Sequence, residues 1–240
     1  NRLVWDSEVV SDVLRAHAEG ANRDRVFIHY GESGQDITYG AFHDTVARIS
    51  GNLIARGLAK GDRVSVFLTN PLITLYAMHA IWASGAIYCP VNSDYLGAPL
   101  AYQIRATDPS LIITDANLLP RLEAYGEFRD ISIIVHGPQS RDHDHSDNAL
   151  QAAARGDIVT FDTLLATAAQ RPPVSVLPDD IANIIFTSGT TGPAKGAVQS
   201  HRFMNAFTFP MRAVGSSEDT VYSDIPLYHV GAVCWNINRA

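Results

Sequence analysis

The strongest constraint on the fold is a stretch without any Lys, Arg, Asp or Glu, which runs from residue 64 to residue 93. A single membrane-spanning helix would need about 20 unbroken apolar residues. Here Asn70 and Pro71 break the stretch near its start, and Gly85 and Pro90 interrupt its end. Strands that are apolar throughout are typical of a parallel sheet covered on both faces. We therefore predict a strand over residues 64–68, a buried helix over 72–83 and a strand over 86–91.

Helices and strands are predicted to alternate along most of the chain. Apolar residues at helical spacing predict a helix over residues 39–56, which Gly57 ends. Further helices are expected at residues 7–18, 99–107 and 116–125, and further strands at 25–30, near 37, at 111–114, 131–135 and 181–186. This alternation indicates an α/β fold with mostly parallel sheets flanked by helices.

A run rich in glycine and hydroxyl side chains, TSGTTGPAKG, extends from Thr187 to Gly196. It follows an apolar strand and leads into a segment with helical potential from Ser200 onward. In such a loop, backbone N–H groups, hydroxyls and the Lys195 ammonium can converge on one anion, and glycines allow a close approach of the backbone. The run predicts a polyphosphate-binding loop. It differs from the P-loop G-x-x-x-x-G-K-[ST], because Ala194 precedes the lysine and no hydroxyl follows it.

This run, with Phe186 before it and His201 after it, resembles the phosphate-loop signature [YF]TSGTTGxPKG of the adenylate-forming enzymes. Pro193 and Ala194 depart from that pattern, but the lysine keeps its register. Four further segments resemble blocks of the same family in the same order, namely residues 37–42 (ITYGAF), 61–64 (GDRV), 82–92 (WASGAIYCPVN) and 226–229 (PLYH). The chain is identified by this resemblance as the N-terminal part of the large domain of an acyl-CoA synthetase-like enzyme.

The resemblance implies the two-step reaction of an ATP-dependent, AMP-forming acid–thiol ligase. A carboxylate attacks the α-phosphorus of ATP to give an acyl-adenylate and pyrophosphate, and the thiol of coenzyme A then takes the acyl group. The matching positions imply a nucleotide-binding set of Thr187, Ser188, Gly189, Thr190, Thr191, Gly192 and Lys195. They also imply a contribution of Thr187 to the Mg²⁺ shell, and catalytic roles for Lys195 and His229, with His229 beside the acyl carboxylate. His201, Tyr39, Tyr88 and Trp82 are expected to be structural.

Two alternatives to an acyl-CoA ligase stay open. The first is an adenylation domain with a different acceptor, as in peptide synthetases, because the discriminating residues of that class lie mostly beyond residue 240. The second is a non-catalytic nucleotide-binding fragment that keeps the fold without the chemistry. The identity of the carboxylic acid and the oligomeric state are not encoded in the motifs above.

The chain is expected to be an incomplete large domain. Residues 231–240 begin an apolar, helical element and stop without the polar boundary that a domain normally has. The resemblance places the adenine, ribose and metal groups and the C-terminal domain further downstream. We expect a first α/β subdomain region over about residues 1–175, and the phosphate loop with the start of the next subdomain over about 179–240. The 240-residue chain alone is expected to be inactive.

The composition limits the classes of binding partner and the location that we expect. The net charge of −7 and the pI near 5.6 argue against a nucleic-acid-binding surface. Cys89 and Cys234 lie in apolar surroundings and predict buried free thiols of a reduced compartment, so we expect a cytoplasmic protein without an integral membrane segment. His143 and His145 lack metal-ligand spacing and predict a solvated loop. The expected partners are a small carboxylic acid, ATP and coenzyme A.

Overall fold

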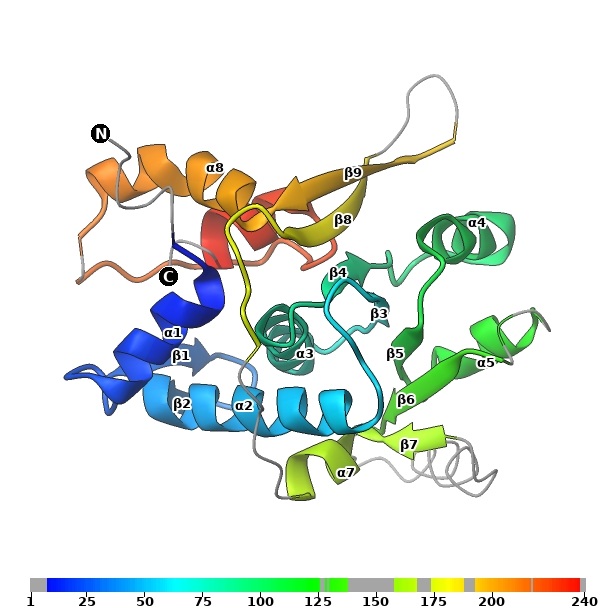
Figure 1. The fold of residues 1–240 in the computed structure, drawn as a ribbon, viewed down its shortest axis with the longest axis horizontal. Coiled ribbons are helices and arrows are strands. Elements are labelled where there is room, and N and C mark those ends of the chain that lie inside the picture. The colour runs from blue at the N-terminus through cyan, green and yellow to red at the C-terminus, as the bar shows by residue number, and fades with distance from the viewer. Residues whose placement is uncertain are drawn as a thin grey trace.

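The computed structural model describes residues 8–125, 128, 130–137, 158–167, 174–187, 193–216 and 218–237. Within this part of the chain, a seven-stranded sheet has the order β7-β6-β5-β3-β4-β8-β9 (Figure 1). Only the β8–β9 pair is antiparallel, and every other pair in this sheet is parallel. The strands are β3 (Arg63–Phe67), β4 (Ile87–Pro90), β5 (Leu111–Asp115), β6 (Ser132–His136), β7 (Ile158–Thr160), β8 (Ile181–Thr187) and β9 (Lys195–Ser200). The predicted α/β fold with a mostly parallel sheet is confirmed.

Helices cover both faces of this sheet. On one face, a core cluster joins Ile113 and Ile134 to the buried sides of α2 (Tyr39–Ala55), α3 (Pro71–Ala83) and α7 (Phe161–Ala166). On the other face, Ile112 packs with residues of α4 (Gly97–Thr107) and α5 (Leu119–Glu123). The alternation of Ile112 and Ile113 between the two clusters follows the two-residue period of a strand.

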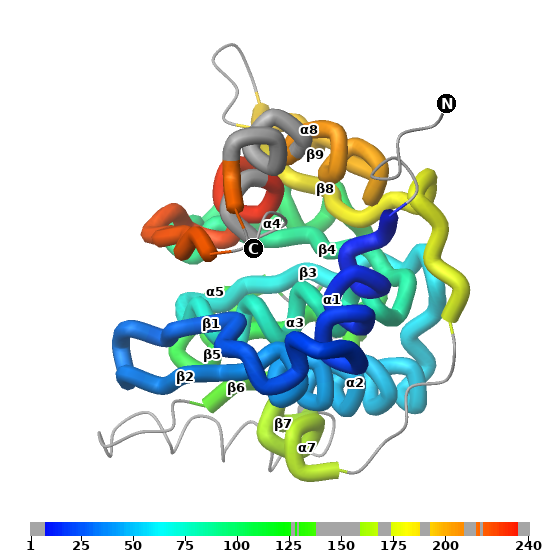
Figure 2. The backbone as a smooth tube through the Cα atoms, turned by 90° about the vertical axis from the view of Figure 1, so that its left-hand side faces the viewer, coloured from blue at the N-terminus to red at the C-terminus, as the bar shows by residue number. Residues whose placement is uncertain are grey.

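The remaining elements lie around this core. Helix α1 (Val10–Glu19) and the antiparallel pair β1 (Val26–Tyr30) and β2 (Gln35–Thr38) precede α2. Helix α8 (His201–Val214) follows β9, and a π-helical segment, η3 (Gly231–Ile237), lies against α8. The ribbon and tube views both place β8, β9 and α8 on the opposite side of the molecule from β7 and α7 (Figures 1 and 2). The edge strand β9 therefore lies far from the other edge.

The uncharged stretch forms β3, α3 and β4 as the sequence predicts. The Asn70 side chain accepts a hydrogen bond from the Ile73 N–H at 3.0 Å, and Pro71 occupies the first turn, so the helix begins where the backbone needs a cap. Gly85 has φ +74° directly after the helix, and the Ala86 N–H donates to the Ile81 carbonyl. This is the glycine-dependent helix end that the sequence suggests.

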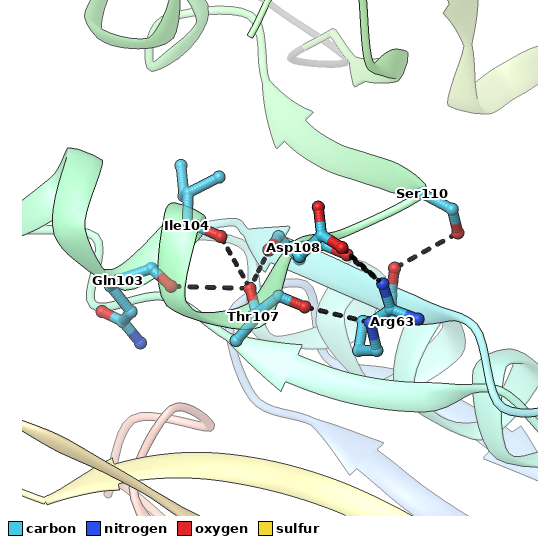
Figure 3. A network of polar contacts seen from close by, with 7 residues as sticks. Arg63, Gln103, Ile104, Thr107, Asp108 and Ser110 are labelled. Atoms are coloured by element: carbon cyan, nitrogen blue, oxygen red, sulfur yellow. Dashed lines mark hydrogen bonds and ion pairs between the residues drawn. The ribbon is translucent and has the colours of Figure 1, made fainter. Parts of the chain in front are cut away.

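A hydrogen-bond network fastens α4 to the start of β3 (Figure 3). The Arg63 guanidinium donates to the carbonyl of Thr107 at 3.0 Å and forms an ion pair with Asp108 at 3.1 Å. Asp108 has φ +44°, the left-handed conformation that ends many helices. On the same helix, the Gln103 amide donates to the Pro90 carbonyl at 2.7 Å. Helix α4 is therefore held against both β3 and β4.

Two differences from the sequence prediction concern the two edge strands of the sheet, β9 and β7. Residues 195–200 form strand β9, so the glycine-rich run connects two strands of a hairpin and does not lead directly into a helix. Strand β7 and helix α7 were not predicted at all. The sequences of β9 and β7 have only a moderate preference for strand. Pairing of β9 with β8 and of β7 with β6 determines their conformation.

Strand β8 joins the same sheet as β3 to β7 through its parallel pairing with β4 at Tyr88 and Asn183. The expected division near residues 175–179 therefore falls between two strands of one sheet. The subdomain boundary itself stays a prediction.

Candidate functional site

The β8–β9 hairpin brings two of the predicted nucleotide-binding residues together. Thr187, the last residue of β8, is the register partner of Lys195, the first residue of β9. The Thr187 hydroxyl donates to the Lys195 carbonyl at 3.4 Å, and both residues are exposed. Ser188, Gly189, Thr190, Thr191 and Gly192 lie outside the described residues. The structure thus places Thr187 and Lys195 opposite each other on the two strands that flank the glycine-rich run.

Tyr102 of α4 contacts this hairpin at the end where its two strands meet the glycine-rich run. The Tyr102 hydroxyl donates to the carbonyl of Ala194 at 3.0 Å, one residue before Lys195. The Tyr102 ring also packs edge-on against Phe186, with ring centroids 6.3 Å apart. Tyr102 belongs to none of the motifs recognised in the sequence, and its only local signal is an aromatic residue at an exposed position of an amphipathic helix.

Glycine at position 196 is required by the close approach of the two strands. A Cβ atom there would lie 2.8 Å from Cγ2 of Ile184 and 3.3 Å from the Phe186 ring. Such a contact is well inside van der Waals distance, so a larger residue would push β9 away from β8. The glycine that follows the lysine therefore sets the distance between the hairpin strands.

Buried polar contacts hold the other end of β8. The Trp82 indole N–H donates to the Ala182 carbonyl at 3.2 Å and to Oδ1 of Asn183 at 3.0 Å. The Asn183 amide in turn donates to Oε1 of Gln199 on β9 at 3.3 Å. Trp82 and Asn183 are fully buried, so their polar atoms depend on these partners. The expected structural role of Trp82 agrees with this position.

A cavity of about 400 Å³ opens at the carboxyl ends of β3 and β4. Ligands of parallel α/β sheets commonly bind at this edge. Leu227 and Tyr228 of the PLYH segment form part of its wall, and the Tyr88 hydroxyl donates to the Leu227 carbonyl at 3.1 Å. Burial and the nearby Asp94 carboxylate raise the pKa of Tyr228, which keeps its hydroxyl protonated. The remaining wall residues are Val66, Leu68, Thr69, Pro71, Thr74, Leu75, Pro90, Val91, Ser93, Asp94, Ser223, Asp224, Ile225 and Pro226.

His229 follows this wall segment but has an exposed side chain. Its Nδ1 atom accepts a hydrogen bond from the Gly231 N–H at 3.1 Å. A neutral imidazole in this arrangement carries its proton on Nε2, which is then available as a donor. His229 is not among the described residues that line the cavity, although its two predecessors are.

His201 occupies a different environment. Its side chain is 1% exposed, and its Nδ1 atom has no hydrogen-bond partner in the described part of the chain. Burial lowers the pKa of His201 to about 4, so the imidazole is neutral at physiological pH. This position agrees with the structural role that the sequence suggests.

The two cysteines are both free and buried, as predicted. Burial raises the pKa of each thiol to about 12, so neither is a reactive thiolate at physiological pH.

Among the described residues, no group of three or more His, Cys, Asp or Glu side chains is placed to hold a metal ion. His143 and His145 lie outside that part of the chain. None of the helices in the described ranges combines the length and the apolar character needed to cross a membrane.

The architecture defines the class as an α/β protein with a mostly parallel sheet and a glycine-rich connection between β8 and β9. The chain belongs to the AMP-binding enzyme family, whose model matches residues 14–240. The resemblance to adenylate-forming, acyl-CoA synthetase-like enzymes is therefore confirmed.

Individual relatives are CoA ligases. The medium/long-chain-fatty-acid–CoA ligase FadD6 of Mycobacterium tuberculosis is 32% identical over 221 residues, which cover 88% of this chain and 33% of that protein. The long-chain-fatty-acid–CoA ligase of Thermus thermophilus is 28% identical over 236 residues, or 96% of this chain and 40% of that protein. The chain thus spans about a third to two fifths of the length of these relatives.

The fold has a solved counterpart in ATP-bound MatB from Rhodopseudomonas palustris. The two superpose with a TM-score of 0.73 and 24% sequence identity, over 97% of this chain and 43% of that one. At this identity the likeness concerns the fold, and it supports the mostly parallel α/β architecture described above.

Proposed function

We propose that the protein carrying this chain is an ATP-dependent acyl-CoA ligase that activates a carboxylic acid as an acyl-adenylate and transfers it to coenzyme A. Membership of the AMP-binding enzyme family and the CoA-ligase relatives support this proposal. The observation that carries it is the register pair of Thr187 and Lys195, which flanks the glycine-rich run. The two relatives named above make medium- and long-chain fatty acids the first acids to test.

In this proposal the hairpin holds the β- and γ-phosphates of ATP while the carboxylate attacks the α-phosphorus. Negative charge then builds on the departing pyrophosphate. A fixed ammonium group stabilises this charge in the transition state more than it stabilises the bound ATP. Lys195 is suited to this role because it is exposed and because Tyr102 and Gly196 fix the strand that carries it. Backbone N–H groups and hydroxyls between residues 188 and 192 complete the proposed cradle.

We further propose that Thr187 contributes its hydroxyl to a Mg²⁺ shell. Thr187 is exposed, and its hydroxyl oxygen is of the hard type that Mg²⁺ binds. When bound, the ion would neutralise part of the phosphate charge. A carboxylate partner for this ion is expected beyond residue 240.

His229 is proposed to orient the acyl carboxylate through its Nε2–H. The Gly231 N–H occupies Nδ1, so the donor faces away from the backbone of this turn. A hydrogen bond to a carboxylate is worth about 1.5–3 kcal/mol. In the intact protein, we therefore expect His229→Ala to raise the KM for the acid about 10- to 100-fold and to leave the KM for ATP unchanged. A parallel rise in both KM values would contradict this role.

The main test is carboxylate-dependent exchange of labelled pyrophosphate into ATP by the intact protein. We expect Lys195→Ala to slow the exchange by about 30- to 1,000-fold, since one such contact is worth about 2–4 kcal/mol in the transition state. Lys195→Arg keeps the charge and should retain part of the activity. Arg15→Ala, which removes an exposed charge on α1, is the matched control and should exchange like the wild type.

The other outcomes separate the alternatives. Exchange without formation of a CoA thioester would indicate an adenylation domain with another acceptor. Triphosphate binding without exchange would indicate a non-catalytic nucleotide-binding protein. Exchange that is unchanged in Lys195→Ala would remove this lysine from the mechanism.

We also propose a cytoplasmic location and a division of the chain into two regions. The two buried free thiols support a reduced, cytoplasmic environment. The division into a first region to about residue 175 and a second from about 179 predicts a protease-sensitive connection between them, which limited proteolysis can locate.

A further inference from the structure

A buried polar triad lies at the carboxyl ends of β3, β5 and β6, away from the β8–β9 hairpin. Asp115 and His136 are register partners at the last positions of β5 and β6, and Oδ1 of Asp115 lies 2.8 Å from Nδ1 of His136. Oδ2 of Asp115 accepts hydrogen bonds from the backbone N–H and the hydroxyl of Thr69, each at 2.6 Å. Three strand ends are thus joined through one carboxylate.

Packing of the sheet does not require polar side chains at positions 115 and 136. Two positions earlier on the same strands and the same face, Ile113 and Ile134 pack into the main core. Burying a carboxylate and an imidazole costs free energy that aliphatic side chains at these positions would not cost. Asp115 and His136 are only 5% and 7% exposed, so this cost applies to them. A role beyond packing explains why such a pair is present.

The pair leaves one polar atom of His136 available. An ionised carboxylate only accepts hydrogen bonds, so Nδ1 of His136 donates to Asp115. In the uncharged tautomer that this contact selects, the lone pair lies on Nε2. Among the described residues, Nε2 has no hydrogen-bond partner. The side chain of His136 is nine-tenths buried and borders a cavity. Nε2 is therefore an oriented acceptor that no donor from the described ranges occupies.

This cavity has a volume of about 650 Å³ and a mostly uncharged polar wall. Its size lies within the range of small-molecule sites, about 300–1,000 Å³. Within the described part of the chain, no Lys or Arg contributes to the wall, and its only carboxylate is Asp115, which already accepts three hydrogen bonds. The wall also contains two aromatic rings, Tyr30 and Tyr76. The other residues are Ser33, Gln35, Thr45, Thr69, Asn70, Leu72, Ile73, Asn117 and Leu165.

These features define the chemistry of a ligand. An anion is disfavoured because the described wall offers no cation to balance its charge. A hydroxyl group suits Nε2 of His136 because it donates to the lone pair, and it can also accept from side-chain amides such as that of Asn117. Neighbouring hydroxyls on one ring would bond several of these donors and acceptors at once. The ring itself would pack against the apolar side chain of Leu72 and the aromatic ring of Tyr76.

We infer that this cavity is a binding site for an uncharged ring that carries hydroxyl groups, either a free sugar or the ribose of a nucleoside, with Nε2 of His136 accepting a hydrogen bond from one hydroxyl. Asp115 is a positioning residue that fixes the ring and its tautomer. The cavity shares the wall residue Thr69 with the cavity of about 400 Å³ beside the PLYH segment, but it does not include Thr187, Lys195 or His229, so its occupancy can be tested apart from the proposed adenylation.

The test measures binding of ribose, adenosine and 2′,3′-dideoxyadenosine to the intact protein by calorimetry and by ¹⁵N resonances of the histidine ring. We expect adenosine, ribose or both to bind, and the Nε2 resonance of His136 to shift on binding. His136→Gln should weaken binding at least tenfold. Asp115→Asn should also weaken it. The Thr69 N–H and hydroxyl hold the amide oxygen, so the amide NH₂ faces Nδ1, reverses the tautomer and turns Nε2 into a donor.

Two further variants keep the test decisive if the buried ones fail to fold. Asn117→Ala lies at an exposed position of the wall and should weaken binding several-fold. His29→Gln is the matched control, because His29 also pairs with a carboxylate, that of Asp36, but is exposed on the β1–β2 hairpin and should bind like the wild type.

The ligand arms identify the source of the hydroxyl groups. Binding of ribose itself indicates a free sugar, whereas binding of adenosine alone indicates a nucleoside. Loss of affinity in the dideoxy compound assigns the contact to the hydroxyls. The inference is overturned if none of the probes binds, or if adenosine binds equally to the wild type, His136→Gln and Asn117→Ala.

Discussion

Acidification should unfold this protein through two buried histidines, and His79 is the clearest case. Its side chain is 3% exposed, and its Nδ1–H donates to the Leu75 carbonyl of the same helix at 2.9 Å. The ring packs edge-on against Phe42 and Trp82, with centroids 5.0 and 5.2 Å away. Burial lowers the pKa of His79 to about 4, although the hydrogen bond to Leu75 opposes this shift.

The sign and size of the effect follow from linkage. In the unfolded chain the imidazole has a pKa of about 6.5, so between pH 4 and 6.5 the unfolded state binds more protons than the folded state. Stability is therefore complete above pH 6.5 and falls as the pH drops towards 4. The difference of about 2.5 between the two pKa values corresponds to about 3 kcal/mol. His201, whose pKa is also lowered to about 4, contributes a similar amount. Together they reach the scale of a typical total stability, about 5–15 kcal/mol.

The assay is urea unfolding of the intact protein at several pH values from 7 to 4.5. Near the middle of this window, each histidine contributes a slope approaching 1.4 kcal/mol per pH unit. His79→Gln should remove about half of the combined slope, whatever its effect on stability at pH 7. Met78→Leu, a substitution at a neighbouring buried residue that cannot titrate, should change stability without changing the slope. Equal slopes for the wild type and His79→Gln would refute the reasoning.

Two further predictions concern the hairpin and the end of α3. Tyr102→Phe keeps the ring against Phe186 but loses the hydrogen bond to Ala194, so we expect a stability change of about 1 kcal/mol or less and a several-fold rise in the KM for ATP. Tyr102→Ala should raise this KM further. Equal KM values for the wild type and both variants in steady-state assays would exclude a positioning role. Gly85→Ala should cost about 1–2 kcal/mol in urea unfolding because of its φ of +74°, whereas Gly31→Ala, which meets no described atom within 4 Å, should be nearly neutral.

Elements with a complete local signal could be predicted from the sequence. Strand β3, helix α3 and strand β4 fall within one or two residues of their predicted bounds, because apolar content, the Asn70-Pro71 cap and Gly85 all indicate the same boundaries. Helix α2 was predicted from its 3.6-residue period for the same reason. In these segments the local sequence and the tertiary packing favour the same structure.

Elements that depend on a distant partner could not be predicted. Residues 195–200 become a strand because β8 lies beside them, and nothing local distinguishes them from a loop. The contact of Tyr102 with Ala194 joins residues 92 positions apart, so it is not visible in any local pattern. The Asp115–His136 pair likewise requires the knowledge that β5 and β6 are neighbours in register.

The order of the strands in the sheet has a consequence for synthesis on the ribosome. Strand β4 ends at Pro90, but its neighbour β8 begins only at Ile181. At about 5–20 residues per second, β4 exposes an unpaired edge for roughly 5 to 20 seconds while the intervening chain is made. During this interval the Trp82 indole also lacks both of its acceptors, Ala182 and Asn183. The nascent chain therefore carries, during this interval, an unpaired edge on a strand that is interior in the finished sheet, and a holding chaperone that covers β4 would protect it until β8 emerges.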